Sequence, residues 1–156
     1  MRKGMDLGRA KETFNLCHEL EIKTQAYFLF GFPGEDEESV SETIAFAKEL
    51  EPDSAQFAVV IPHPGTELFS MCQEKGWLVY ESWEDFAACN SLIETDSFSR
   101  EDAEHARIRA YREFYFRPSL ILKALSRIRR WKDVQRLYRG GLSVLSRVSF
   151  FERARG

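Results

Sequence analysis

The sequence predicts an α/β fold with parallel strands. Two apolar segments, residues 25–30 (QAYFLF) and 55–61 (AQFAVVI), are typical of strands, and each is followed by a turn and a helix-like segment. One helix between two strands is the pattern of a βαβ unit, whose strands are parallel neighbours. Both strands are apolar on both faces, as in sheets that helices cover. The residues by themselves leave a doubly wound sheet and a barrel both open.

The composition is that of a globular domain. Of 156 residues, 44% are hydrophobic and 30% are charged, which allows one sizeable core. No apolar run approaches the roughly 20 residues needed to cross a bilayer. The opening MRKGMDLGRAKE contains no apolar stretch like that of a signal peptide. We therefore expect a cytoplasmic protein.

The net charge of −3 conceals two segments of opposite charge. Residues 1–99 contain 7 Lys and Arg against 19 Asp and Glu, whereas residues 100–156 contain 15 against 6. The first explanation is that the basic segment packs on the acidic one. A second is that residues 142–151 (LSVLSRVSFF) contact a membrane surface. Nucleic acid is not the expected partner, because the basic residues form no stripe with stacking aromatics.

The helices are predicted from apolar residues at helical spacing. The first covers residues 7–20 and has no convincing capping residue. The second, residues 35–50, begins with an acidic turn, and the third, residues 67–75, ends at Gly76.

The region beyond Gly76 is less periodic. Residues 77–96 predict a loop or short helix anchored by Trp83 and Phe86. Ser99 is typical of a capped start to a helix that Pro118 ends, and residues 120–131 and 134–145 predict further helices. We expect an α/β part over residues 1–96 and an all-helical extension over residues 97–156.

The three cysteines, Cys17, Cys72 and Cys89, are widely spaced and odd in number. This pattern fits neither a disulfide framework nor a zinc site. We expect each to be a small buried hydrophobe, and we predict no metal site.

The first motif is the strand end and turn of residues 27–35 (YFLFGFPGE). Ligands of parallel α/β folds lie beyond the carboxyl ends of the strands. Gly31 and Gly34 allow close approach of the backbone, and Pro33 stiffens the turn. Acidic residues at positions 35–38 would repel a phosphate at the next helix start. An ordinary strand-to-helix turn is the alternative.

Strand alternation divides the side chains between two faces. One face is uniformly apolar and should pack on helices, and the other should line a barrel lumen or cleft. The lumen-facing set is Gln25, Tyr27, Leu29 and Gly31 of the first strand with Gln56, Ala58, Val60 and Pro62 of the second.

The second motif, residues 62–66 (PHPGT), places His63 between two prolines and Thr66 as an N-cap. His63 is a weak candidate for a general acid or base, since a lone loop histidine is more often structural or solvated.

Three phrases in order resemble one family. FLFGFPGE, PDSAQFAVVIPHPGTELF and RAYREFYFRP resemble the radical S-adenosylmethionine enzymes, in the branch with an N-terminal cobalamin-binding domain. That branch includes anaerobic magnesium-protoporphyrin monomethyl ester oxidative cyclases and several methyltransferases. The resemblance implies that residues 1–96 are the later part of a (β/α) barrel, with its fifth and sixth strands.

The resemblance also implies roles for the strand ends. The cofactor-binding set, against the adenine of S-adenosylmethionine, is Tyr27, Leu29, Gly31, Pro33, Gly34, Val60, Ile61 and Pro62. The substrate-facing set is Gln25, Gln56, Ala58 and His63. His63 departs from the aromatic residue that the family pattern leads us to expect there.

The family's CxxxCxxC loop, whose thiolates hold a [4Fe–4S] cluster, is missing. We therefore expect a fragment that is inactive alone, with the rest of the barrel as its partner and self-association through uncovered strand edges. The implied cofactors are S-adenosylmethionine and the cluster in the full-length protein, with cobalamin left open, and the implied substrate is a small or lipid-like molecule. The alternatives are a non-catalytic scaffold with a basic tail and a barrel enzyme of another class. The second alternative lacks a strand-end lysine or carboxylate pair.

Overall fold

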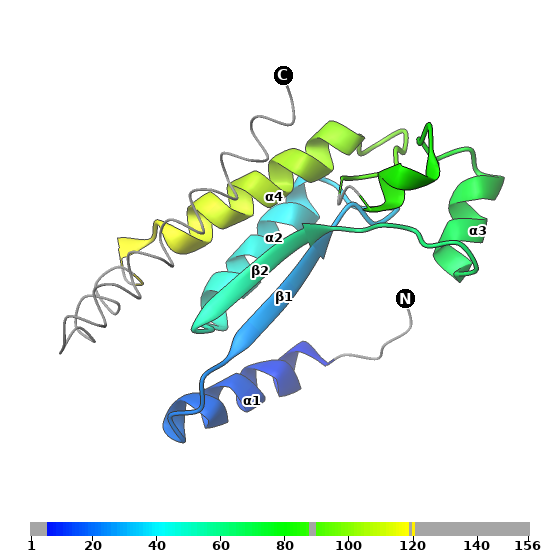
Figure 1. The fold of residues 1–156 in the computed structure, drawn as a ribbon. Coiled ribbons are helices and arrows are strands. Elements are labelled where there is room, and N and C mark those ends of the chain that lie inside the picture. The colour runs from blue at the N-terminus through cyan, green and yellow to red at the C-terminus, as the bar shows by residue number, and fades with distance from the viewer. Residues whose placement is uncertain (1–5, 88–89, 119, 121–156) are drawn as a thin grey trace. The chain divides into compact units, whose positions relative to one another are not determined.

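Two parallel strands organise the structure, a computed structural model that describes residues 6–87, 90–118 and 120 (Figure 1). Strand β1 (Gln25–Phe30) pairs with β2 (Ser54–Val59), from Gln25 opposite Ser54 to Phe30 opposite Val59. The helices are α1 (Leu7–Glu19), α2 (Glu37–Glu49), α3 (Glu67–Glu74) and α4 (Arg100–Tyr115), with a 3₁₀ helix, η1, at Trp83–Ala87. The predicted α/β class and parallel pairing are confirmed.

Helix α2 packs along the sheet against β1 (Figure 1). Stacked aromatic rings form the centre of this core: the ring centroid of Phe57 lies 5.4 Å from that of Phe28 and 6.2 Å from that of Phe30. The fully or nearly buried apolar residues of these elements are Ala26, Phe30, Val40, Ile44, Ala47, Ala55, Phe57 and Val59. This is the apolar, helix-packed face that strand alternation predicts.

A second cluster lies beyond the end of β2. Val60, Cys72 and Ile93 are buried together, with Leu68 and Trp77 partly covering them. An antiparallel bridge between Leu78 and Ile93 brings the residues after α3 beside residues 92–94. Cys72 is therefore a buried hydrophobe as predicted, whereas Cys17 is half-buried and Cys89 lies outside the described residues.

Several helix ends follow the predicted caps. The Thr66 hydroxyl accepts a hydrogen bond from the Phe69 amide at 3.2 Å, and Ser99 and Asp102 exchange bonds at the start of α4. The absence of a cap at the first helix is a wrong prediction. Asp6 accepts from the Gly8 amide at 2.8 Å, so a carboxylate one residue before Leu7 caps α1.

Two other boundaries differ from the prediction by two residues. Helix α2 begins at Glu37, because Asp36 and Ser39 form a capping box in front of it. Strand β2 ends at Val59, because Val60 donates the last bond, to the Phe30 carbonyl at 2.7 Å, before the chain turns towards Pro62.

The chain divides into two units, Met1–Arg107 and Ile108–Gly156. In the second, Tyr111 and Tyr115 stack at 6.1 Å, and the guanidinium of Arg117 lies 4.5 Å from the ring centroid of Phe114. The helices predicted over 120–131 and 134–145, and the interfacial segment 142–151, lie outside the described residues. Within the described residues, no helix is both long enough and apolar enough to cross a bilayer.

Candidate strand-end site

One face of the sheet is open. Tyr27 and Leu29 are 67% and 41% exposed, and their partners across the ladder, Gln56 and Ala58, are half-buried. Gln25, at the start of β1, is exposed as well. The structure thus brings these five residues to one face, as alternation predicts, while their contacts with a ligand stay a prediction.

The turn after β1 is held by Glu35. The Gly31 amide donates to Oε2 of Glu35 at 2.7 Å, and the Glu35 amide donates to the Phe32 carbonyl at 3.0 Å. Gly31 and Gly34 have φ values of 93° and 92°, which side-chain-bearing residues rarely adopt. Between them Pro33 is half-buried and Gly34 is exposed.

Glu35 holds the turn through its carboxylate, whereas the sequence reasoning used it only as a negative charge. Burial raises the pKa of this carboxyl, and hydrogen bonds from the Gly31 and Phe32 amides partly oppose the rise. The sequence did contain a signal for this contact, namely a glutamate four residues after a glycine at the end of a strand. Its Oε2 atom accepts the Gly31 amide hydrogen and so connects the turn to the end of β1.

The raised pKa of Glu35 predicts a pH dependence of stability. The folded state holds this proton more tightly than the unfolded chain, in which the pKa of a glutamate is about 4.3. The protonated carboxyl therefore makes its full contribution to the free energy of unfolding below that pH. This contribution is lost as pH rises through the higher folded pKa. Glu35→Gln keeps an acceptor for the Gly31 amide and removes the titration. Urea unfolding from pH 4 to pH 7 should therefore show a smaller decline for Glu35→Gln than for the wild type.

The control is Glu38→Gln, on the exposed side of the same helix start. Its stability curve should run parallel to that of the wild type. A Glu35→Gln curve that also runs parallel would mean that burial of the carboxyl has no energetic consequence.

The connection after β2 forms the neighbouring strand end. Val60 is buried by Cys72 and Ile93, Ile61 is half-buried and Pro62 is buried. His63 is exposed, and its carbonyl oxygen accepts the Thr66 hydroxyl at 2.7 Å. Val60 therefore does not share the exposure of Tyr27 and Leu29, because β2 and its alternation end one residue earlier.

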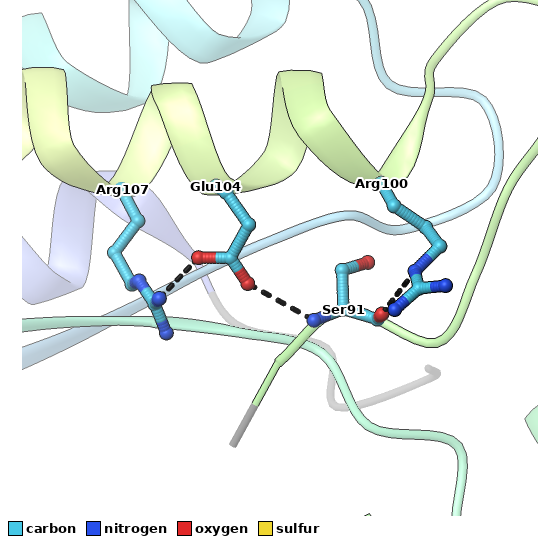
Figure 2. Close-up of polar contacts among 4 residues, drawn as sticks. All are labelled: Ser91, Arg100, Glu104 and Arg107. Atoms are coloured by element: carbon cyan, nitrogen blue, oxygen red, sulfur yellow. Dashed lines mark hydrogen bonds and ion pairs between the residues drawn. The ribbon is translucent and has the colours of Figure 1, made fainter. Parts of the chain in front are cut away.

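A partly buried polar network joins Ser91 to α4 (Figure 2), and the Ser91 hydroxyl lies close to Gly31. The Ser91 amide donates to Oε1 of Glu104 at 3.0 Å, Arg107 pairs with the other oxygen of Glu104, and Nε of Arg100 donates to the Ser91 carbonyl at 2.8 Å. The sequence reasoning missed this network. The spacing of Arg100, Glu104 and Arg107 puts them on one side of a helix, but nothing local indicates their partner.

The described residues do not fit an iron–sulfur cluster. In the part of the chain that the structure describes, no three His, Cys, Asp or Glu side chains gather where they could hold a metal. Cys72 is fully buried, and burial raises the pKa of its thiol, which disfavours the thiolate that such a cluster needs.

Known methyltransferases and a cyclase are similar in sequence to this chain. An uncharacterised methyltransferase of Pyrococcus horikoshii is 34% identical over 121 residues, which cover 78% of this chain and 26% of that protein. Bacteriochlorophyllide d C-8(2)-methyltransferase of Chlorobaculum tepidum is 25% identical over 109 residues, 70% of this chain and 24% of that protein. The anaerobic magnesium-protoporphyrin IX monomethyl ester cyclase of Cereibacter sphaeroides is 27% identical over 110 residues, 70% of this chain and 18% of that protein.

The chain is related in sequence to these methyltransferases and to this cyclase. The resemblance to radical S-adenosylmethionine relatives, first seen in three short phrases, is thereby confirmed. The chain spans about a quarter or less of the length of each of these relatives. No protein-family model matches the sequence.

Proposed function

We propose that this chain supplies the adenine- and substrate-facing strand ends of a radical S-adenosylmethionine enzyme of the methyltransferase or cyclase type. The observation that carries the proposal is the open sheet face of Tyr27 and Leu29, which runs directly into the turn at Gly31. An apolar face beside a turn with two glycines, which carry no side chains, suits a flat heteroaromatic ring.

Each part of the site has a separate task in this proposal. Leu29 and Tyr27 contact the ring, Gly31 and Gly34 let the backbone approach it, and Pro33 restricts the turn between them. On β2, the connection at 60–62 contributes backbone and apolar contacts. Gln56 and Ala58, together with Gln25, face the substrate, and exposed His63 is the weak candidate for proton transfer.

S-adenosylmethionine, cleaved reductively with an electron from a [4Fe–4S] cluster, would supply the radical chemistry. Because the described residues do not fit that cluster, its ligands belong to another part of the enzyme, and the use of cobalamin stays open. Two relatives are named for bacteriochlorophyllide d and for magnesium-protoporphyrin IX monomethyl ester. For the enzyme that contains this chain we propose a small-molecule or lipid-like substrate.

The rest of a (β/α) barrel is the proposed partner. Among the described residues, each strand has a single neighbour, so each leaves one edge with backbone groups that another strand can pair. A two-stranded sheet is marginal alone. Without the remaining strands, the chain is expected to be inactive and to associate with itself.

The test is a titration of the ¹⁵N-labelled chain with S-adenosylmethionine and with adenosine. We expect the backbone amide signals of residues 27–32, 34 and 58–61 to move, since Pro33 and Pro62 have no amide hydrogen. Leu29→Glu, which puts a charge on the open face, should weaken binding by about tenfold or more, equivalent to about 1.4 kcal/mol. Leu16→Glu is the matched control, since Leu16 is an exposed leucine of α1. Shifts confined to other residues, or equal affinities for the two variants, would overturn the proposal.

A further inference from the structure

Arg107 and Ser91 are among the most buried polar residues of the described chain, at 2% and 1% exposed. Burying a guanidinium is costly unless a carboxylate compensates its charge and hydrogen bonds engage its N–H groups. Arg107 pairs with Glu104, one turn before it on α4, and that carboxylate is mostly buried too. The proposed function uses none of these residues.

Side chains of α4 bind the backbone of Ser91 from two sides. Glu104 accepts its amide hydrogen, and Arg100 donates to its carbonyl oxygen (Figure 2). We call the four residues Ser91, Arg100, Glu104 and Arg107 the Ser91 latch. Glu104 is central to it, because one oxygen binds Ser91 while the other binds Arg107.

The Ser91 latch lies against the turn of the candidate site. A Cβ atom placed on Gly31 would be 3.3 Å from Cβ of Ala103 and 3.6 Å from Oγ of Ser91. Ala103 precedes Glu104 on α4, and the Ser91 backbone is bound by Glu104. The surface that packs against Gly31 is therefore formed by Ser91 of the latch and by Ala103 in the first turns of α4.

We propose that Glu104, held by Arg107, is a positioning residue that sets Ser91 and α4 against Gly31 and so orders the strand-end turn. The proposal depends on the proposed function only for what the turn binds. The ordering of Gly31 is measurable without any nucleoside. The titration of Glu35 is a second measure of that ordering, because the Glu35 carboxylate accepts a hydrogen bond from the Gly31 amide.

The experiment compares Glu104→Ala and Glu104→Gln in the ¹⁵N,¹³C-labelled chain. Glu104→Ala removes the acceptor for Ser91, so hydrogen exchange at the Ser91 and Gly31 amides should rise by about tenfold or more. The Glu35 carboxyl should titrate at lower pH than in the wild type, because water reaches the loosened turn. Glu104→Gln keeps an oxygen for the Ser91 amide and should restore most of both readouts.

The matched control is Glu113→Ala, which removes another ion pair of α4: Oε1 of Glu113 lies 2.8 Å from Nε of Arg109, and both side chains are over a third exposed. It should leave Gly31 and Glu35 unchanged. If Glu104→Ala does not fold, Arg107→Lys, which keeps the charge and loses the planar fork, takes its place with the same expected direction. Faster exchange at Ser91 with unchanged Gly31 and Glu35 would overturn the proposal. Failure of the proposed function would appear separately, as absence of nucleoside binding by the wild type.

Discussion

Replacing Phe57 with alanine is expected to remove about 3–5 kcal/mol from the free energy of unfolding, as truncation of a buried aromatic residue does. Phe57 is 2% exposed and stacks with Phe28 and Phe30 of the neighbouring strand. Its loss leaves a cavity beside the rings of Phe28 and Phe30, in a core that β1, β2 and α2 form within the described residues. Urea unfolding followed by circular dichroism measures the change.

The control for Phe57→Ala is Gln56→Ala, one residue earlier and on the opposite, open face of β2. We expect a change within about 0.5 kcal/mol there, as for substitutions away from the core. Because domains of this size have about 5–15 kcal/mol of stability in total, Phe57→Ala should leave a protein close to its unfolding threshold. Equal effects of the two variants would contradict the stacked core.

Replacing Gly31 with alanine is expected to be the most damaging substitution among the glycines that the structure describes. Its φ of 93° alone costs a side-chain-bearing residue about 1–3 kcal/mol. The new Cβ would also crowd Cβ of Ala103 at 3.3 Å, which overpacks this contact and adds to that cost. Thermal unfolding measures the sum, and nucleoside binding should fall with it because the turn is displaced.

Gly34→Ala separates the two contributions. Gly34 has almost the same φ, 92°, but no atom lies within 4 Å of its added Cβ. Gly34→Ala should therefore show the backbone cost without the crowding, and Gly31→Ala should unfold at a clearly lower temperature. If both variants unfold at the same temperature, the contact with Ala103 does not contribute to the destabilisation.

The strands and their faces were predictable because they depend on local pattern. Alternation placed Ala26 and Phe30 towards the helices and Tyr27 and Leu29 on the other side, and the burial of these residues agrees. The Thr66 cap was predictable for the same reason, since its partner amide is three residues away. The cap of α1 was equally predictable, because Asp6 stands one residue before the helix and binds the amide of Gly8. The end of β2 was not, because it depends on how the chain turns after Val60.

The resemblance to radical S-adenosylmethionine enzymes and the parallel βαβ unit followed from the sequence by itself, because motif order and the two-residue period of a strand are properties of neighbouring residues. The Ser91 latch was decided only by the tertiary structure. Its helix contributes charges at a recognisable spacing, but Ser91 belongs to a loop with no periodicity, and Gly31 lies 60 residues earlier in the chain. Burial lowers the local dielectric and makes their pairing matter, and burial exists only once distant segments have packed together.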